Sequence, residues 1–359
     1  MTEPLWRPST EKTASANLTA FTKKLEQDYA LSLSDYDALH QFSLESKEMF
    51  WTAVWDFVGV IAESRGTRVL VDGDKMPGAQ FFPDARLNFA ENLLRRRDET
   101  DALVFWAEDQ IKRRMSWRTL HEEVSKLAAA LRDFGIKPGD RCAGFLPNAP
   151  EAVIAMLAST AVGAVWTSCS PDFGKQGVID RFGQVEPKVL FACDGYIYDG
   201  KSYDSLGRIA EILGSLPTIE HTIVFPYLTT SPDIGGIANG VLWADFVSGR
   251  AEGEIDFEPL PFAHPLYIMY SSGTTGVPKC IVHSVGGTLL QHLKEHRLHG
   301  DVKPGDRIFY FTTCGWMMWN WLVSALAIKA KIVLFEGNPF HPGPARLWEL
   351  AETENIAVF

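Results

Sequence analysis

Residues 141–170 read RCAGFLPNAPEAVIAMLASTAVGAVWTSCS, and no other stretch of the chain indicates its fold so clearly. Two short apolar runs, 141–147 and 165–171, have the length of strands, and the segment between them, 149–164, has the length of a helix. All three segments are apolar on every side, as expected for parallel strands and a helix that are fully covered. The stretch therefore predicts a βαβ unit.

The same alternation continues in both directions. Before it, 102–109 predicts a strand and 116–135 a helix that begins at Ser116 and ends at Gly135. After it, we expect strands at 188–194, 265–272, 308–313 and 331–337, helices at 177–187, 286–299, 319–330 and 347–355, and the start of a strand at 356–359. Residues 226–260 are expected to be loop. The sequence thus predicts an α/β fold with mostly parallel sheets flanked by helices.

The first part of the chain has a different pattern. Residues 38–64 carry aromatic and branched side chains at helical spacing, which predicts helices packed by that apolar face. We therefore expect a helical extension over residues 1–98, followed by the α/β domain over residues 99–359.

Composition limits the functions to be considered. The net charge of −11 disfavours nucleic acid and anionic membranes as partners. The five cysteines are odd in number and widely spaced, which indicates a reducing compartment and, with no secretion signal at the start of the chain, a cytoplasmic location. The late apolar run 319–328 is shorter than the roughly 20 residues of a membrane span. Small-molecule substrates are therefore the expected partners. The sequence does not determine whether the protein forms oligomers.

The run YSSGTTGVPK at 270–279 has the composition of a phosphate-binding loop. Gly273 and Gly276 permit positive φ and close approach of the backbone to a ligand, and the serines and threonines add hydroxyl donors. Lys279 adds a positive charge. The run follows a predicted strand and precedes a predicted helix, but it matches neither the Walker A nor the GxGxxG pattern. An ordinary mobile surface loop is the alternative.

Several segments together resemble one family. YSSGTTGVPK with CIVHS after it, and PNAPEAVIAMLASTAVGAVWTSCSPDFG at 147–174, resemble the adenylate-forming acyl-CoA synthetases. FFPDARLNFAENLL at 81–94 is similar to the N-terminal extension of the acetyl-CoA synthetase branch. SPDFGKQGVIDRFGQVEPKVLF, HSVGGTLLQHLKEH and TTCGWMMWNWLVSALA look most like the acetoacetate branch. The resemblance covers nearly the whole chain.

The resemblance implies a ligase that works in two steps. A carboxylate, here acetoacetate, attacks the α-phosphate of ATP with Mg²⁺, giving an acyl-adenylate and pyrophosphate, and the thiol of CoA then displaces AMP. It also implies which residues hold the ATP phosphates: Ser271, Ser272, Gly273, Thr274, Thr275, Gly276 and Lys279. Of these, Thr274 and Lys279 would be catalytic. A merely solvated Lys279 is the alternative.

Further site residues follow from the same resemblance. Trp316, Met317 and Met318 would shape the acyl pocket, where flexible methionines suit a short chain. Asn320 would offer its amide to the 3-oxo group of acetoacetate. Lys201 would lie near the CoA nucleotide. The alternatives are ordinary core packing for residues 316–320 and a solvated loop lysine for Lys201.

The segment HLKEH at 292–296 also fits the H-x-x-E-H pattern of some zinc peptidases. On a helix, His292 and His296 would lie one turn apart and share a metal, with Glu295 as the base. No third ligand segment follows in the sequence. The family resemblance instead places these residues on a surface helix after the phosphate loop, without a metal.

Motifs that the family carries further along are not found within residues 1–359. They include the adenine-binding segment, an aspartate for the ribose and a small C-terminal domain with a reactive lysine. We therefore expect an N-terminal portion with an incomplete AMP-binding domain and no small C-terminal domain. Two alternatives stay open: a synthetase for acetate or propionate, and a nucleotide-binding fragment without turnover.

Overall fold

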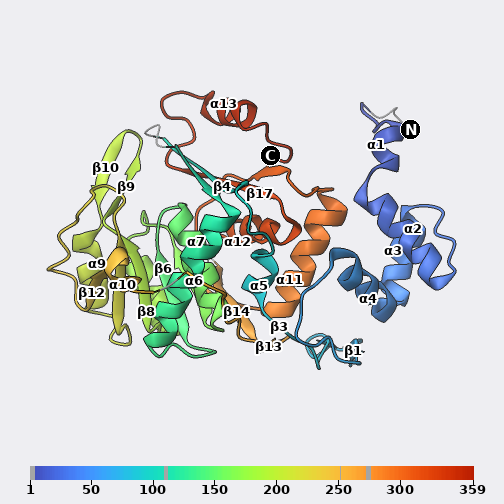
Figure 1. The fold of residues 1–359 in the computed structure, drawn as a ribbon, viewed down its shortest axis with the longest axis horizontal. Coiled ribbons are helices and arrows are strands. Elements are labelled where there is room, and N and C mark those ends of the chain that lie inside the picture. Colours follow the sequence, from blue (N-terminus) through green and yellow to red (C-terminus); the bar gives the residue numbers. More distant parts are fainter. Residues whose placement is uncertain (1–4, 109–111, 251, 272–275) are drawn as a thin grey trace.

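A seven-stranded sheet organises the computed structural model, which describes residues 5–108, 112–250, 252–271 and 276–359 (Figure 1). In spatial order its strands are β12 (Gly240–Leu242), β11 (His221–Phe225), β8 (Val189–Cys193), β6 (Arg141–Phe145), β7 (Val165–Cys169), β14 (Pro265–Ser271) and β15 (Lys279–Ser284). All neighbours are parallel except β14 and β15. The predicted α/β fold with mostly parallel sheets is confirmed.

Both faces of this sheet are covered. Along β8, Leu190 and Ala192 belong to one apolar cluster with α8 (Lys175–Val185) and α9 (Leu206–Leu213), whereas Val189 and Phe191 face the larger core with α6 (Trp117–Asp133) and α7 (Pro150–Ala161). Side chains alternate across a strand, so an apolar run fills both faces. This is why the stretch 141–170 reads as apolar throughout.

A second sheet contains β16 (Arg307–Phe309), β17 (Lys331–Glu336), β4 (Asp101–Ala107) and β5 (Lys112–Ser116), in that order. One side carries α12 (Met317–Ser324) and the 3₁₀ turn η2 (Ala325–Ile328), and the other packs Leu350 of α13 (Arg346–Thr353). Val358 makes a single parallel bridge to Ile308, which agrees with the predicted strand start at 356–359.

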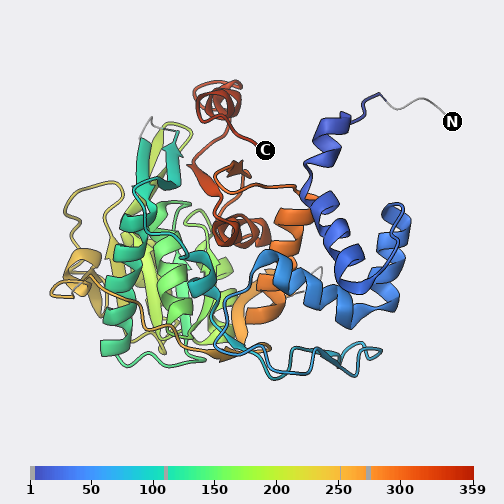
Figure 2. The same ribbon diagram turned by 45° about the vertical axis from the view of Figure 1, so that its right-hand side comes forward.

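The N-terminal extension packs against one side of the domain, as two views agree (Figures 1 and 2). It contains α1 (Thr10–Ala14), α2 (Asn17–Tyr29), α3 (Tyr36–Glu45), α4 (Lys47–Val58), and a hairpin of β1 (Leu70–Val71) and β2 (Gln80–Phe81). β3 (Arg86–Leu87), which pairs with β13 (Leu260–Pro261), and α5 (Phe89–Leu93) lead into the domain. The extension contacts α11 (Val285–Lys294) and the π-helical turn η1 (Glu295–His299), and both parts share one apolar core.

Some predictions of local structure are wrong. Residues 226–260 were expected to be loop, but they contain β12, which forms the edge of the first sheet, and the short helix α10 (Trp243–Phe246). The strand expected at 308–313 spans only 307–309, because the chain then turns toward α12. The sequence reading also missed β5, α9, β11 and the hairpin of β9 (Gly195–Tyr198) and β10 (Lys201–Asp204). β5 and β10 are short, polar and largely exposed, so no apolar period marks them. α9 and β11 do carry apolar side chains, and the sequence reading overlooked them because they are short.

Candidate functional site

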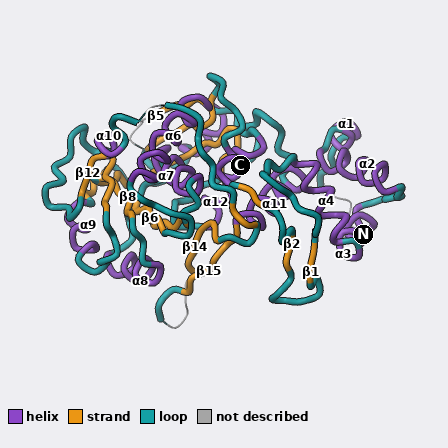
Figure 3. The backbone as a smooth tube through the Cα atoms, turned by 60° about the horizontal axis from the view of Figure 1, so that its bottom comes forward, coloured by secondary structure: helices purple, strands orange, loops and turns teal. Residues whose placement is uncertain are grey.

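The candidate phosphate loop joins two antiparallel strands. Ser271 ends β14 and lies opposite Lys279, the first residue of β15 (Figure 3). The helix expected at 286–299 is confirmed by α11 and η1, but the sequence reading missed β15, which occupies residues 279–284 between the loop and that helix. Pairing along β14 turns the short run KCIVHS into an edge strand although Ile281 and Val282 remain exposed.

The described part of this loop has the features that a phosphate site needs. Gly276 has φ 116°, a conformation that favours glycine. The carbonyl oxygen of Pro278 accepts a hydrogen bond of 2.9 Å from Nε2 of Gln184, which links the end of the loop to α8. Within the described ranges, no carboxylate lies within ion-pair distance of exposed Lys279, so its charge is available to a ligand. The candidate residues Ser272, Gly273, Thr274 and Thr275 lie outside the described residues.

The segment 312–320 is fixed at the carboxyl ends of the parallel strands. Ser168 on β7 donates its hydroxyl to the carbonyl oxygen of Cys314 at 2.7 Å. The thiol of Cys314 lies 3.4 Å from the carbonyl oxygen of Pro147, just beyond β6. Ligands of open α/β sheets bind at this edge, so the segment stands where substrate contacts are expected.

Asn148 links this segment to both sheets, and the sequence reading missed it. Its Oδ1 accepts from Nε1 of Trp319 at 2.9 Å. Its Nδ2 donates to the carbonyl oxygens of Thr312 and Phe335, each at 3.2 Å, and its backbone N–H donates to Oε2 of Glu336 at 2.6 Å. A polar residue directly after a buried strand, as in FLPN, was the signal that could have found it.

Glu336 is the most strongly perturbed carboxyl group near this segment. It ends β17 with only 7% of its surface exposed. Burial raises the pKa of its carboxyl to about 8, against the opposing effect of the hydrogen bond from Asn148, and the negative charges of Asp172 and Glu108 raise it further. Glu336 is therefore largely protonated at neutral pH.

The predicted acyl-pocket residues divide between a surface groove and the interior. Met317 and Met318 line a groove of about 730 Å³ together with residues of β15 and α11 and with Trp321. Trp316 is 62% exposed, whereas Asn320 is buried. Of the predicted set, Met317 and Met318 therefore share one wall, while Trp316 lies outside it.

Asn320 contacts the strand that carries the phosphate loop. Its Nδ2 lies 3.1 Å from Sδ of Met269 on β14 and 3.4 Å from the carbonyl oxygen of Trp316. The amide nitrogen expected to reach the 3-oxo group is thus engaged, and it is Oδ1 that has no partner. Asn320 borders a cavity of about 10 Å³, close to the size of one water. This geometry offers a buried acceptor rather than a donor.

Lys201 lies in the β9–β10 hairpin, where it is exposed and pairs in register with Tyr198. Figure 1 shows this hairpin well separated from β14. The structure brings Ser271, Lys279, Asn320 and the two methionines to neighbouring elements, but it does not bring Lys201 to them.

The two histidines of HLKEH share a serine. His292 Nδ1 and His296 Nε2 each lie 3.0 Å from Oγ of Ser324, which itself donates to the carbonyl oxygen of Trp321. Both rings are buried, and burial lowers their pKa values to about 3 and about 4. The expected surface helix is wrong, because α11 is covered by the N-terminal extension and by α12. Across the described ranges, no group of three or more His, Cys, Asp or Glu is arranged to hold a metal.

Comparison with known proteins shows the family to which the chain belongs. The profile of the AMP-binding enzyme family matches residues 89–359, and that of the acetyl-coenzyme A synthetase N-terminus matches residues 36–93. None of the described helices is both long and apolar enough to cross a membrane.

Individual relatives extend this result. An acetoacetyl-coenzyme A synthetase of Rhizobium meliloti is 51% identical over 357 residues, which cover 99% of this chain and 54% of the relative. A malonamoyl-CoA synthetase of Penicillium aethiopicum is 40% identical, and the match covers 96% of this chain and 49% of the length of that relative. The solved structure of acetoacetyl-CoA synthetase from Streptomyces lividans superposes with a TM-score of 0.93 at 44% identity, covering 99% of this chain and 55% of that one. The chain thus spans about half the length of the relatives that it matches.

Proposed function

Because this chain belongs to the AMP-binding enzyme family, we propose that it contributes the phosphate-binding and acyl-binding parts of an acid–thiol ligase that activates acetoacetate with ATP and transfers it to CoA. The observation that carries the proposal is the conjunction of exposed Lys279, without a carboxylate partner among the described residues, and Asn320, which contacts the same strand through Met269. Phosphate and acyl group would thus be held on neighbouring elements. The division into an extension, 1–98, and a domain, 99–359, is part of the proposal.

Each residue has a separate role in this proposal. Lys279 and the loop from Ser271 to Gly276 hold the ATP phosphates, with Thr274 and Lys279 stabilising the charge of the departing pyrophosphate. Mg²⁺ accompanies those phosphates, since it binds through phosphates and few protein groups. Met317 and Met318 border the acyl group, and Lys201 remains the proposed contact for CoA. The unpaired cysteines favour a cytoplasmic setting.

The first test is binding of pyrophosphate and ATP to purified 1–359 by calorimetry. Loss of one charge-assisted contact in Lys279→Ala should weaken binding by about tenfold or more, with the melting temperature unchanged. Lys175→Ala is the matched control, since Lys175 is an exposed lysine at the start of the neighbouring α8, where it pairs with Glu211 at 3.3 Å. Equal affinity in both variants would refute the role of Lys279.

The second test is exchange of labelled pyrophosphate into ATP, driven by acetoacetate, acetate or propionate. Exchange that prefers acetoacetate would support the proposed substrate. Preference for acetate or propionate would favour the shorter-acid alternatives. Pyrophosphate binding without exchange would identify this chain as a nucleotide-binding part that needs further residues for turnover.

One observation favours a second substrate. The unpartnered, buried Oδ1 of Asn320 is an acceptor, and it suits an acid whose far end carries an N–H donor. Malonamate carries an NH2 group on its far carbonyl, where acetoacetate carries a methyl group that cannot donate. Malonamate should therefore be included in the exchange assay, and Asn320→Leu should lower its rate more than that of acetoacetate. Equal loss for both acids would argue against this contact.

A further inference from the structure

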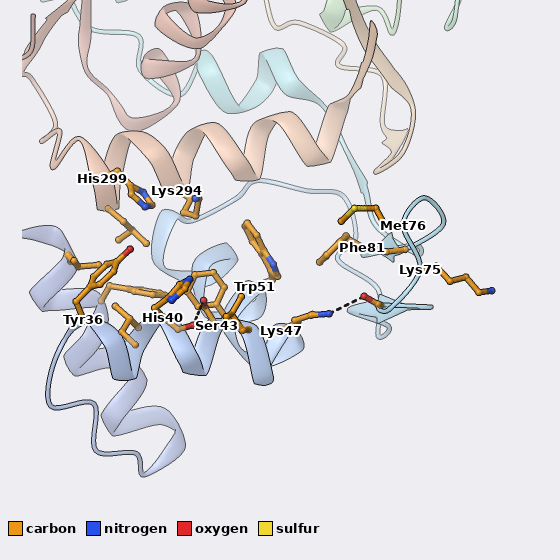
Figure 4. Close-up of a pocket in the computed structure, with 18 residues that line it drawn as sticks. Tyr36, His40, Ser43, Lys47, Trp51, Lys75, Met76, Phe81, Lys294 and His299 are labelled. Atoms are coloured by element: carbon orange, nitrogen blue, oxygen red, sulfur yellow. Dashed lines mark hydrogen bonds between the residues drawn. The ribbon is translucent and has the colours of Figure 1, made fainter.

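A cavity of about 420 Å³ lies between the N-terminal extension and the domain (Figure 4). Its walls come from α2, α3, α4, the β1–β2 hairpin and the end of α11 with η1. Most of the lining is apolar and aromatic, including Leu18, Leu39, Phe50, Trp51, Phe81 and Leu298. The volume falls within the range of small-molecule sites, and none of the ATP-loop or acyl-pocket residues lines it.

The charged side chains of the lining are lysines. They are Lys47, Lys75 and Lys294, and none of the described residues that line the cavity is Asp or Glu. Figure 4 shows Lys294 and His299 on one side and His40 and Lys47 on the other, while Lys75 points outward. An anion at the edge of the cavity beside Lys47 would therefore meet a positive charge.

The two best-placed lysines are held at this edge by weak or shared contacts. Lys47 Nζ donates to the carbonyl oxygen of Gly73 at 3.1 Å, and the carboxylate of Asp74, 3.5 Å away, is fully exposed. Lys294 has only 15% of its side chain exposed and lies 2.7 Å from Oε1 of Glu295, which also accepts from Gln291. The Lys47–Asp74 pair is solvated, and such a pair is readily replaced by a ligand carboxylate that is partly shielded from water.

We propose that this cavity binds an amphiphilic carboxylate of medium length. Its apolar body would pack between Trp51, Phe81 and Leu298, and its carboxylate would accept a hydrogen bond from Lys47. The apolar walls account for the tail and the excess of cations for the head, so an uncharged molecule with the same tail should bind less well. The proposal is independent of the ligase reaction.

The cavity and the acyl groove are lined by neighbouring residues of the same segment. Lys294 lines the cavity, whereas its partner Glu295 lines the groove that contains Met317 and Met318. The same helix, α11, therefore separates the proposed site from the candidate acyl site by the thickness of one helix.

Calorimetric titration of octanoate into purified 1–359 tests the proposal. We expect saturable binding at one site, at least tenfold weaker binding of octanol, and no saturable binding of acetate. Lys47→Gln should weaken octanoate binding about tenfold, because it removes one charge-assisted contact. Lys24→Gln is the matched control, since Lys24 belongs to the same extension, pairs with Asp28 and lies outside the cavity; its affinity should not change.

Filling the cavity gives a second variant. Ser43 lies on the cavity wall, partly exposed, and Ser43→Phe should abolish octanoate binding. Unchanged binding in both Ser43→Phe and Lys47→Gln, equal affinity for octanol, or no saturable binding of octanoate would each overturn the proposal. Displacement of octanoate by excess acetoacetate would also overturn it, because it would place octanoate in the acyl groove.

Discussion

Replacing Glu336 by glutamine should stabilise the protein at neutral pH, and the gain should grow as the pH rises. Burial raises the pKa of the Glu336 carboxyl to about 8, whereas the unfolded chain titrates near about 4.3. Between these two values the folded state keeps a proton that the unfolded state has released. The wild type therefore has its full contribution from this group below the unfolded pKa and loses it progressively as the pH rises to the folded pKa.

The magnitude follows from the difference between the two pKa values. Each pH unit in this window lowers the free energy of unfolding by about 1.4 kcal/mol, which amounts to about 5 kcal/mol over the whole window. Glutamine keeps an oxygen that can accept from the backbone N–H of Asn148 but does not titrate. From pH 6.0 to pH 7.5, the advantage of Glu336→Gln over the wild type should grow by about 2 kcal/mol.

Urea unfolding of both proteins at the two pH values measures this change, with the slope m compared to confirm that the same surface is exposed. Glu48→Gln is the control: Glu48 lies exposed on α4, and its substitution should change stability by less than about 0.5 kcal/mol at either pH. A difference between wild type and Glu336→Gln that does not depend on pH would refute the reasoning. It would mean that the carboxylate is ionised in the folded protein and compensated there.

Three further substitutions or reactions test the interior around the site. Asn148→Ala leaves the indole N–H of Trp319 and two carbonyl groups without partners, so the free energy of unfolding in urea should fall by about 3 kcal/mol; a loss below about 1 kcal/mol would contradict that account. Ser324→Ala removes the hydroxyl shared by two buried histidines and should lower stability by about 2 kcal/mol, whereas Ser324→Thr, which keeps the hydroxyl, should lose less. Of the five cysteines only Cys280 is exposed, so iodoacetamide should modify one thiol in the native protein and five after unfolding, as counted by mass spectrometry; a second native adduct would show that a buried thiol is accessible.

Much of the fold could be predicted from local pattern. Ser116 caps α6 by accepting from the N–H of Thr119 at 3.1 Å, and Gly135 follows the helix with φ 82°, as the sequence reading expected. The buried strands β6, β7 and β8 were predicted near their observed positions. These features depend on residues that are close in sequence, because caps, turns and side-chain period act over one or two turns of chain.

The candidate site was only partly predictable. Composition pointed to the loop that begins at Ser271 and ends at Lys279, but the run KCIVHS is too short for its period to distinguish a strand from the start of a helix. Pairing with β14 determined the strand. The two histidines of HLKEH fitted a metal pattern, and only the approach of Ser324 from α12 shows how their nitrogens are used.

The sequence by itself determined the alternation of strands and helices around residues 141–170, the covered parallel sheet and the composition of the candidate phosphate loop. The tertiary structure alone decided that Asn148 meets Glu336 across 188 residues of chain, that burial raises the pKa of Glu336, and that a cationic, apolar cavity forms where the extension contacts α11. The physical reason is the range of the interactions. Backbone preference and side-chain period act between near neighbours, whereas loss of hydration and long-range hydrogen bonds exist only after distant segments have packed together.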